Sequence, residues 1–120
     1  MEMMSDYYYT ILDGTILSVT AKTSLDTNLF SMSGGGIVYQ LGIDGKVVDS
    51  HEHKTMPKAG SMFAILEQGN RKISIRVDVS PGMFKVRYTM LIDDSEVTLK
   101  KTSESELKAL WHKKNITGSI

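Results

Sequence analysis

The sequence predicts one mostly β domain, an antiparallel β-sandwich or partly closed barrel of about eight strands with one short C-terminal helix. Turn-forming residue pairs recur at intervals of roughly a dozen residues, as they do in all-β domains. The segments between the turns are rich in Val, Ile, Tyr, Phe and Thr, which favour strands. A length of 120 residues suffices for one hydrophobic core but not for two, so we expect residues 1–120 to form a single domain.

Two Asp-Gly pairs give the strongest hairpin signals. The pair at 13–14 follows a predicted strand at 7–12, and the pair at 44–45 separates the segments 37–43 and 46–50. Asp and Gly tolerate the positive φ angles of a type I′ turn, so both pairs predict tight two-residue hairpins. Further turns are predicted at Gly69-Asn70, Pro81-Gly82 and Asp93-Asp94.

Apolar and polar residues alternate most regularly from residue 72 onward. Every second residue is apolar in the segments 72–79, 84–92 and 96–100, and most of the residues between are polar or charged. This period of two predicts a three-strand meander with one face buried, which supplies much of the core. The first of these strands is expected to bury Ile73, Ile75, Val77 and Val79.

Residues 22–36 interrupt the succession of strands. They contain many Ser, Thr, Asp and Asn residues and end in three consecutive glycines. Such a composition predicts a long flexible connection. Apolar residues within it, including Phe30, suit a lid that packs over the open end of the sheet, whereas a plain Greek-key crossover or a disordered loop is the alternative.

A short amphipathic helix is predicted at about 104–114. Ser103 and Glu106 have the spacing of a capping box, and Leu107, Leu110 and Trp111 recur at helical spacing on one side. We expect this apolar side to dock on the sheet, with a partner-binding helix as the alternative.

Composition narrows the classes of partner. Fourteen Lys and Arg balance fourteen Asp and Glu, so the chain lacks the positive charge that nucleic-acid binding requires. No apolar run reaches the length of a membrane span, and the absence of cysteine suits a reducing compartment, so we expect a soluble cytoplasmic protein. Basic residues on two neighbouring strands are interpreted as a solvated face, and they are Arg71, Lys72, Arg76, Lys85 and Arg87.

His51-Glu52-His53 is the one metal-like pattern in the sequence. Strand alternation places both imidazoles on one face, and the segment resembles the opening of the cupin metal motif. The carboxylate expected a few residues later is missing from residues 54–58, and no second histidine half-motif follows. We therefore favour an exposed polar strand end, expect no cofactor, and keep His51 and His53 as weak metal candidates. No Gly-X-Ser-X-Gly motif indicates a nucleophile.

Three consecutive tyrosines, Tyr7, Tyr8 and Tyr9, lie in the first predicted strand. On a strand they divide between two faces, so together with Phe30 and Trp111 they are the candidate protein-binding residues. The alternative is that these rings complete the core. We also expect exposed edges at the first strand, which has no internal charge or proline, and at whichever meander strand remains unpaired. An open edge predicts a homodimer.

Six strand and turn segments carry a family resemblance from about residue 36 to 101, and they are Val38-Tyr39, Ile43 to Lys46, Ile73 to Ile75, Gly82 to Phe84, Tyr88 to Ile92 and Leu99 to Lys101. Their order resembles that of the Fas apoptotic inhibitory molecule domain. The departures from that pattern are His51, where the family has tryptophan, and Asp94, where it has glycine. The resemblance implies a β-sandwich without catalytic residues that acts through protein contacts, in cell survival or in protection against aggregation.

Three functions remain after this reading. The leading hypothesis is a non-enzymatic protein-interaction module. The second is a small β-barrel carrier that binds an apolar small molecule, and the third is a metal-dependent, cupin-like enzyme that uses His51 and His53.

Overall fold

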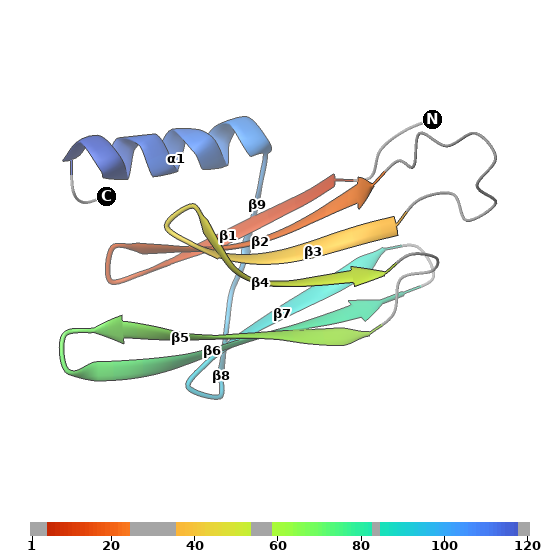
Figure 1. Cartoon of the computed structure of the whole chain (residues 1–120), viewed down its shortest axis with the longest axis horizontal. Coiled ribbons are helices and arrows are strands. Elements are labelled where there is room, and N and C mark those ends of the chain that lie inside the picture. Colours follow the sequence, from red (N-terminus) through yellow and green to blue (C-terminus); the bar gives the residue numbers. More distant parts are fainter. Residues whose placement is uncertain (1–4, 25–35, 54–58, 83–84, 118–120) are drawn as a thin grey trace.

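A computed structural model describes residues 5–24, 36–53, 59–82 and 85–117. In this part of the chain, nine strands form two antiparallel sheets that face each other, and one helix covers the outer side of the first sheet (Figure 1). The predicted sandwich with a C-terminal helix is confirmed, and the sheets do not close into a barrel. No described helix is both long and apolar enough to cross a membrane.

Sheet A has the strand order β4-β3-β2-β1-β9, and sheet B has the order β5-β6-β7-β8. The strands of sheet A are β1 (Ser5–Leu12), β2 (Thr15–Ser24), β3 (Gly36–Ile43), β4 (Lys46–His53) and β9 (Lys100–Thr102). The strands of sheet B are β5 (Gly60–Gln68), β6 (Arg71–Pro81), β7 (Val86–Ile92) and β8 (Ser95–Val97).

The hairpin turns follow the sequence signals. Asp13, Gly14, Asp44 and Gly45 all have positive φ angles, between 47° and 88°, as type I′ turns require. Both Asp-Gly hairpins are therefore confirmed. The turn between β7 and β8 has the same character without a glycine, because its two aspartates have φ angles of 48° and 66°.

Two of these turn aspartates also bind the neighbouring strand. Asp44 donates its backbone N–H to Ile16 O at 2.8 Å, and its Oδ1 accepts the N–H of Ile16 at 2.9 Å. Asp93 makes the same pair of bonds with Ser74, both at 2.9 Å. Each aspartate thus extends the hydrogen-bonding ladder of its sheet one step past the last paired strand residue and fixes where the hairpin ends.

The core lies between the inner faces of the two sheets. The predicted inward residues of β6 are at most 3% exposed, and Leu17, Val19, Tyr39 and Met62 are fully buried. The alternation predicted for β6 is therefore confirmed, and that of β7 is confirmed from Val86 to Ile92. Phe84, predicted to share the buried face, lies outside the described residues. At roughly 1.5–3 kcal/mol for each large apolar side chain, this layer supplies most of the apolar free energy of folding.

The third predicted meander strand differs from the structure. Residues 96–100 read as one alternating strand, but β8 ends at Val97 and the chain then crosses from sheet B to sheet A. Val97 at the end of β8 and Leu99 on the crossing segment still pack against the core. The crossing delivers β9 to the edge of β1, where residues 100–102 pair with residues 7–9.

This pairing corrects the expectation that the first strand is an open edge. β1 has β2 on one side and β9 on the other over its three tyrosines. The predicted long connection is also shorter than expected at both ends, because Lys22 pairs with Val38 and Ser24 pairs with Gly36. Residues 25–35, including Phe30 and the predicted lid, lie outside the described residues.

Helix α1 (Glu104–Thr117) is three residues longer than predicted and docks on sheet A. Ser103 Oγ accepts the N–H of Glu106 at 3.2 Å, which confirms the N-cap, while the Glu106 carboxylate accepts a hydrogen bond from Thr102. Leu107 is buried, as predicted for the apolar side. Trp111 lies over Gly45, where a β-carbon would come within 3.2 Å of the indole, so this turn needs glycine for its φ angle and for its helix contact.

We expect Asp44→Ala to reduce the free energy of unfolding by roughly 1–3 kcal/mol, because it leaves the N–H of the buried Ile16 without an acceptor. Asp13→Ala is the matched control. Its φ of 47° is close to the 51° of Asp44, but its side chain has no hydrogen bond to any described residue. Equal losses for the two variants in urea unfolding would attribute the effect to backbone strain and not to the hydrogen bond.

We expect Asp94→Gly to stabilise the chain by roughly 0.5 kcal/mol. An L residue in the left-handed region costs about 1–2 kcal/mol, and the extra freedom of glycine in the unfolded chain returns part of that gain. Thermal unfolding with Asp94→Ala as the control tests this, because alanine keeps the β-carbon that causes the strain. A stabilisation by alanine equal to that by glycine would contradict the explanation.

Candidate functional site

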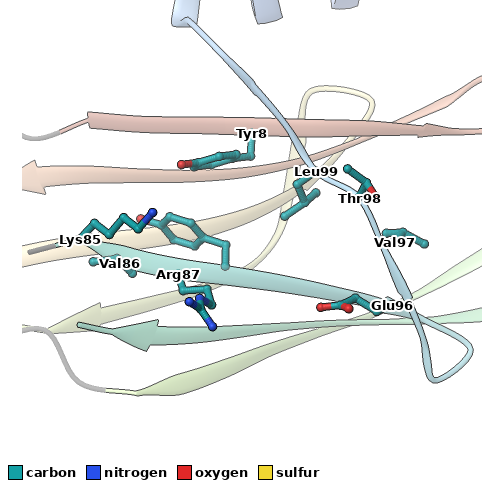
Figure 2. Close-up of a pocket in the computed structure, with 9 residues that line it drawn as sticks. Tyr8, Lys85, Val86, Arg87, Glu96, Val97, Thr98 and Leu99 are labelled. Carbon is teal, nitrogen blue, oxygen red and sulfur yellow. The ribbon is translucent and has the colours of Figure 1, made fainter. Parts of the chain in front are cut away.

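A cleft of about 410 Å³ lies at the edge of the sandwich, where β7 of sheet B approaches β1 of sheet A. Figure 2 shows Tyr8 on the sheet A side, Lys85 and Val86 at one end, and residues 97–99 on the segment that crosses between the sheets. The cleft is lined by Tyr8, Lys85, Val86, Arg87, Tyr88, Glu96, Val97, Thr98 and Leu99.

The backbone of β7 is open along this cleft. β8 pairs only with residues 90–92, so in the described part of the chain residues 86–89 have β6 on one side and no strand on the other. Ile92 and Ser95 flank the two-residue turn and form a hydrogen-bonded pair in such a hairpin. The alternation of an antiparallel ladder then directs the N–H and C=O groups of Tyr88 and Val86 toward the cleft.

Aromatic rings form the inner wall of the cleft. The rings of Tyr8 and Tyr88 have centroids 5.2 Å apart, and Tyr39 lies behind them at 6.2 Å from Tyr88. The hydroxyl of Tyr88 donates to Asp6 Oδ2 at 2.8 Å. This bond joins the two sheets directly, because Asp6 is on β1 and Tyr88 is on β7. The wall is therefore mostly aromatic, and the hydroxyl proton of Tyr88 is already used in the bond to Asp6.

Burial raises the pKa of Tyr88 far above the ordinary tyrosine value, and the hydrogen bond to Asp6 and the negative charge of Asp6 raise it further. Burial also raises the pKa of Tyr39, with a smaller contribution from Asp6. Both phenols therefore stay protonated at neutral pH, and Tyr88 keeps the proton that it donates to Asp6.

The rim of the cleft carries uncompensated charge. Lys85 and Arg87 are exposed, and neither makes an ion pair with another described residue. Arg76, on the neighbouring strand, differs in being paired with Asp78 at 2.8 Å. Glu96 lies on β8, so one end of the cleft is positive and the other end has a negative residue.

A second pair of sheet edges lies on the opposite side of the sandwich, at β4 and β5. Phe63 and Ile65 on β5 are 59% and 62% exposed. Asp49 on β4 bridges this side, because its Oδ2 accepts the N–H of Phe63 at 2.8 Å. A carboxylate thus already occupies part of the β5 edge, whereas no described strand or carboxylate binds the edge of β7 at residues 86–89.

The predicted protein-binding residues are distributed over several places. Tyr8 lines the cleft, and Tyr7 and Tyr9 lie on the other face of sheet A by strand alternation. The Tyr7 hydroxyl approaches Glu104 Oε2 at 3.4 Å, and Trp111 is half-buried between α1 and sheet A. The three tyrosines and Trp111 therefore do not form one surface.

His51 lies at the boundary between the sheets. It pairs with Tyr39 across the β3–β4 ladder and packs so closely on Gly60 that a β-carbon there would come within 2.5 Å of the imidazole. His53 pairs with Ile37 at the end of β4, and its side chain is outside the described part of the structure. Within the described residues, no group of three or more His, Cys, Asp or Glu side chains is arranged to hold a metal ion.

Sequence reasoning missed most of the cleft. Tyr88, Val97 and Leu99 are predicted only as core strand residues, and Lys85 and Arg87 only as part of a solvated face. One usable signal was present, since two basic residues, Lys85 and Arg87, come just before the aromatic residue Tyr88 within four positions.

Comparisons of the chain with protein-family models, with curated proteins and with solved structures find no match. The function therefore has to be inferred from the cleft itself.

We expect Tyr88→Phe to lower the free energy of unfolding by about 1.5 kcal/mol at neutral pH, because it removes a hydrogen bond to a carboxylate. The difference from the wild type should narrow above pH 10. Folding favours the neutral phenol, so the contribution of Tyr88 is fully present below the unfolded pKa of 10.0 and declines as the pH rises beyond it.

Urea unfolding measured over a pH series tests this expectation. Tyr9→Phe is the control, because the Tyr9 hydroxyl has no hydrogen bond to a described residue. A constant difference between wild type and Tyr88→Phe up to strongly alkaline pH would contradict the assigned role of the Tyr88 proton.

Proposed function

We propose that this chain is a non-enzymatic protein-interaction module that binds an extended segment of another protein. The single observation that carries the proposal is the edge of β7 at residues 86–89, which pairs with no second strand in the described part of the chain. It opens into a cleft with an aromatic wall and two basic residues that have no ion-pair partner among the described residues. An exposed strand edge provides a row of backbone donors and acceptors that another chain can pair with.

The chemistry of the cleft supports binding over catalysis. Burial and the bond to Asp6 raise the pKa of Tyr88, so this phenol of the wall stays protonated, while the lysine and arginine of the rim are exposed and suited to ion pairs. The resemblance to the Fas apoptotic inhibitory molecule domain also implies a role through protein contacts. The carrier hypothesis depended on a closed barrel, and that premise is wrong because the two sheets remain open.

Selection from a displayed library of random short peptides tests the proposal. We expect enriched peptides that bind the purified chain saturably, at micromolar concentrations typical of weak, short interfaces. The control is a core variant such as Val77→Asp, which buries an unpaired charge among fully buried residues and is expected to unfold. Enrichment of the same peptides on the folded and the unfolded chain, or no enrichment at all, would contradict an interaction module.

A further inference from the structure

We infer that the cleft accepts one extended peptide strand, antiparallel to β7, in which acidic and apolar residues alternate. The inference rests on the proposed function and specifies its partner. It follows from three features of the cleft, which are the free backbone edge, the inward wall and the outward charges.

The backbone edge fixes where the peptide lies. β8 runs antiparallel to β7 and leaves the sheet after Val97, so an incoming strand would continue the line of β8 beside residues 86–89. The N–H and C=O groups of Val86 and Tyr88 would then pair with the peptide backbone, as in other cases of strand addition. These bonds are independent of the peptide sequence and give affinity without selectivity.

The inward side chains set the apolar positions. A peptide residue directly opposite Tyr88 points to the same side of the sheet as Tyr88, which is the space between the two sheets. There it meets the rings of Tyr8 and Tyr88 and the side chain of Leu99. Two of these groups are aromatic and one is aliphatic. An apolar peptide side chain therefore gains the most binding free energy from being buried at this position.

The outward side chains set the acidic positions. A peptide residue opposite Arg87 points away from the core, to the face on which Arg87 is exposed and without an ion-pair partner among the described residues. A carboxylate there can form charge-assisted hydrogen bonds with the guanidinium. Lys85 extends the positive charge toward the same end, whereas Glu96 at the other end repels an acid. The charges therefore favour a peptide whose acidic residues lie at the Lys85 end.

The observations favour a foreign peptide over a second copy of this chain. The strand that a second copy would offer is β5, the other edge strand of sheet B. Its outward residues include only one acid, and they are Ser61, Phe63, Ile65 and Glu67. Part of that strand is also already bonded to Asp49. A second copy is thus a poorer match to Lys85 and Arg87 than a peptide with alternating acids.

The test uses a short fluorescent peptide that alternates valine and glutamate and has capped ends. We expect saturable binding by fluorescence anisotropy, and we expect Arg87→Glu to weaken it about tenfold because an attractive pair becomes a repulsive one. Arg71→Glu is the matched control. It makes the same change of charge at an exposed position on the opposite end of sheet B and should leave the affinity unchanged.

Two further peptides test the pattern. Replacing glutamate by lysine should abolish binding, and grouping the valines and glutamates into two blocks should weaken it, because the composition is kept and the alternation is lost. Amide chemical-shift changes on the wild-type chain should be confined to Tyr8 and to residues 85–89 and 96–99.

Several results would overturn the inference. These are no saturable binding of the alternating peptide, equal binding by Arg87→Glu and the wild type, or equal binding of the block peptide. If sedimentation shows a dimer that Arg87→Glu dissociates, the cleft holds a second copy and the foreign-peptide assignment fails. If library peptides bind but Arg87→Glu does not affect them, the interaction module stands and only this cleft is excluded.

Discussion

The pairing of β9 with β1 is the constraint on which the rest of this structure depends. Three residues, Lys100–Thr102, leave the line of β8 and add to the edge of sheet A. The same crossing covers the edge of β1 at its tyrosines, brings Leu99 and Val97 against the core, and positions Ser103 to cap the helix. It also ends β8 early. As a result β1 gains a second partner strand, and residues 86–89 of β7 have no second partner among the described strands. The cleft lies beside this part of β7, so it is a direct consequence of the crossing.

The two turn aspartates explain why the sheets keep their register despite these short strands. Each places a carboxylate oxygen on the N–H of the adjacent strand, at Ile16 in sheet A and at Ser74 in sheet B. Register in a two-sheet sandwich must be correct to a single residue, since a slip by one moves every core side chain to the solvent face. In sheet A the same residue, Asp44, also pairs with Lys114 and so connects the hairpin to the helix.

The features that depend on local chemistry could be predicted from the sequence. The features that depend on which of the two sheets a strand joins could not. The Asp-Gly turns, the alternation from Ile73 to Val79 and the Ser103 cap could be predicted because each depends on residues a few positions apart. The crossing after Val97 could not, because residues 96–100 keep a strand-like alternation throughout and no glycine or proline marks the change of sheet. The cleft depends on that crossing, so Tyr8 is the one candidate of the tyrosine run that the structure brings to it.

Different side chains line the sheet edges on the two sides of the sandwich. This difference supports the assignment of the cleft as a binding site for a peptide strand. An open edge is a liability for any β protein, because it invites uncontrolled pairing between chains. On the β4–β5 side, Asp49 reduces that liability by accepting the N–H of Phe63 with a charged group. On the β7 side no described carboxylate does so, and basic residues occupy the rim instead. Positive charges at the rim repel the same rim on a second copy, which disfavours pairing of two β7 edges. They attract an acidic strand, so the edge remains available to a partner of opposite charge. A chain of zero net charge can achieve this selectivity because the interaction depends on the few charges beside the edge and not on the total.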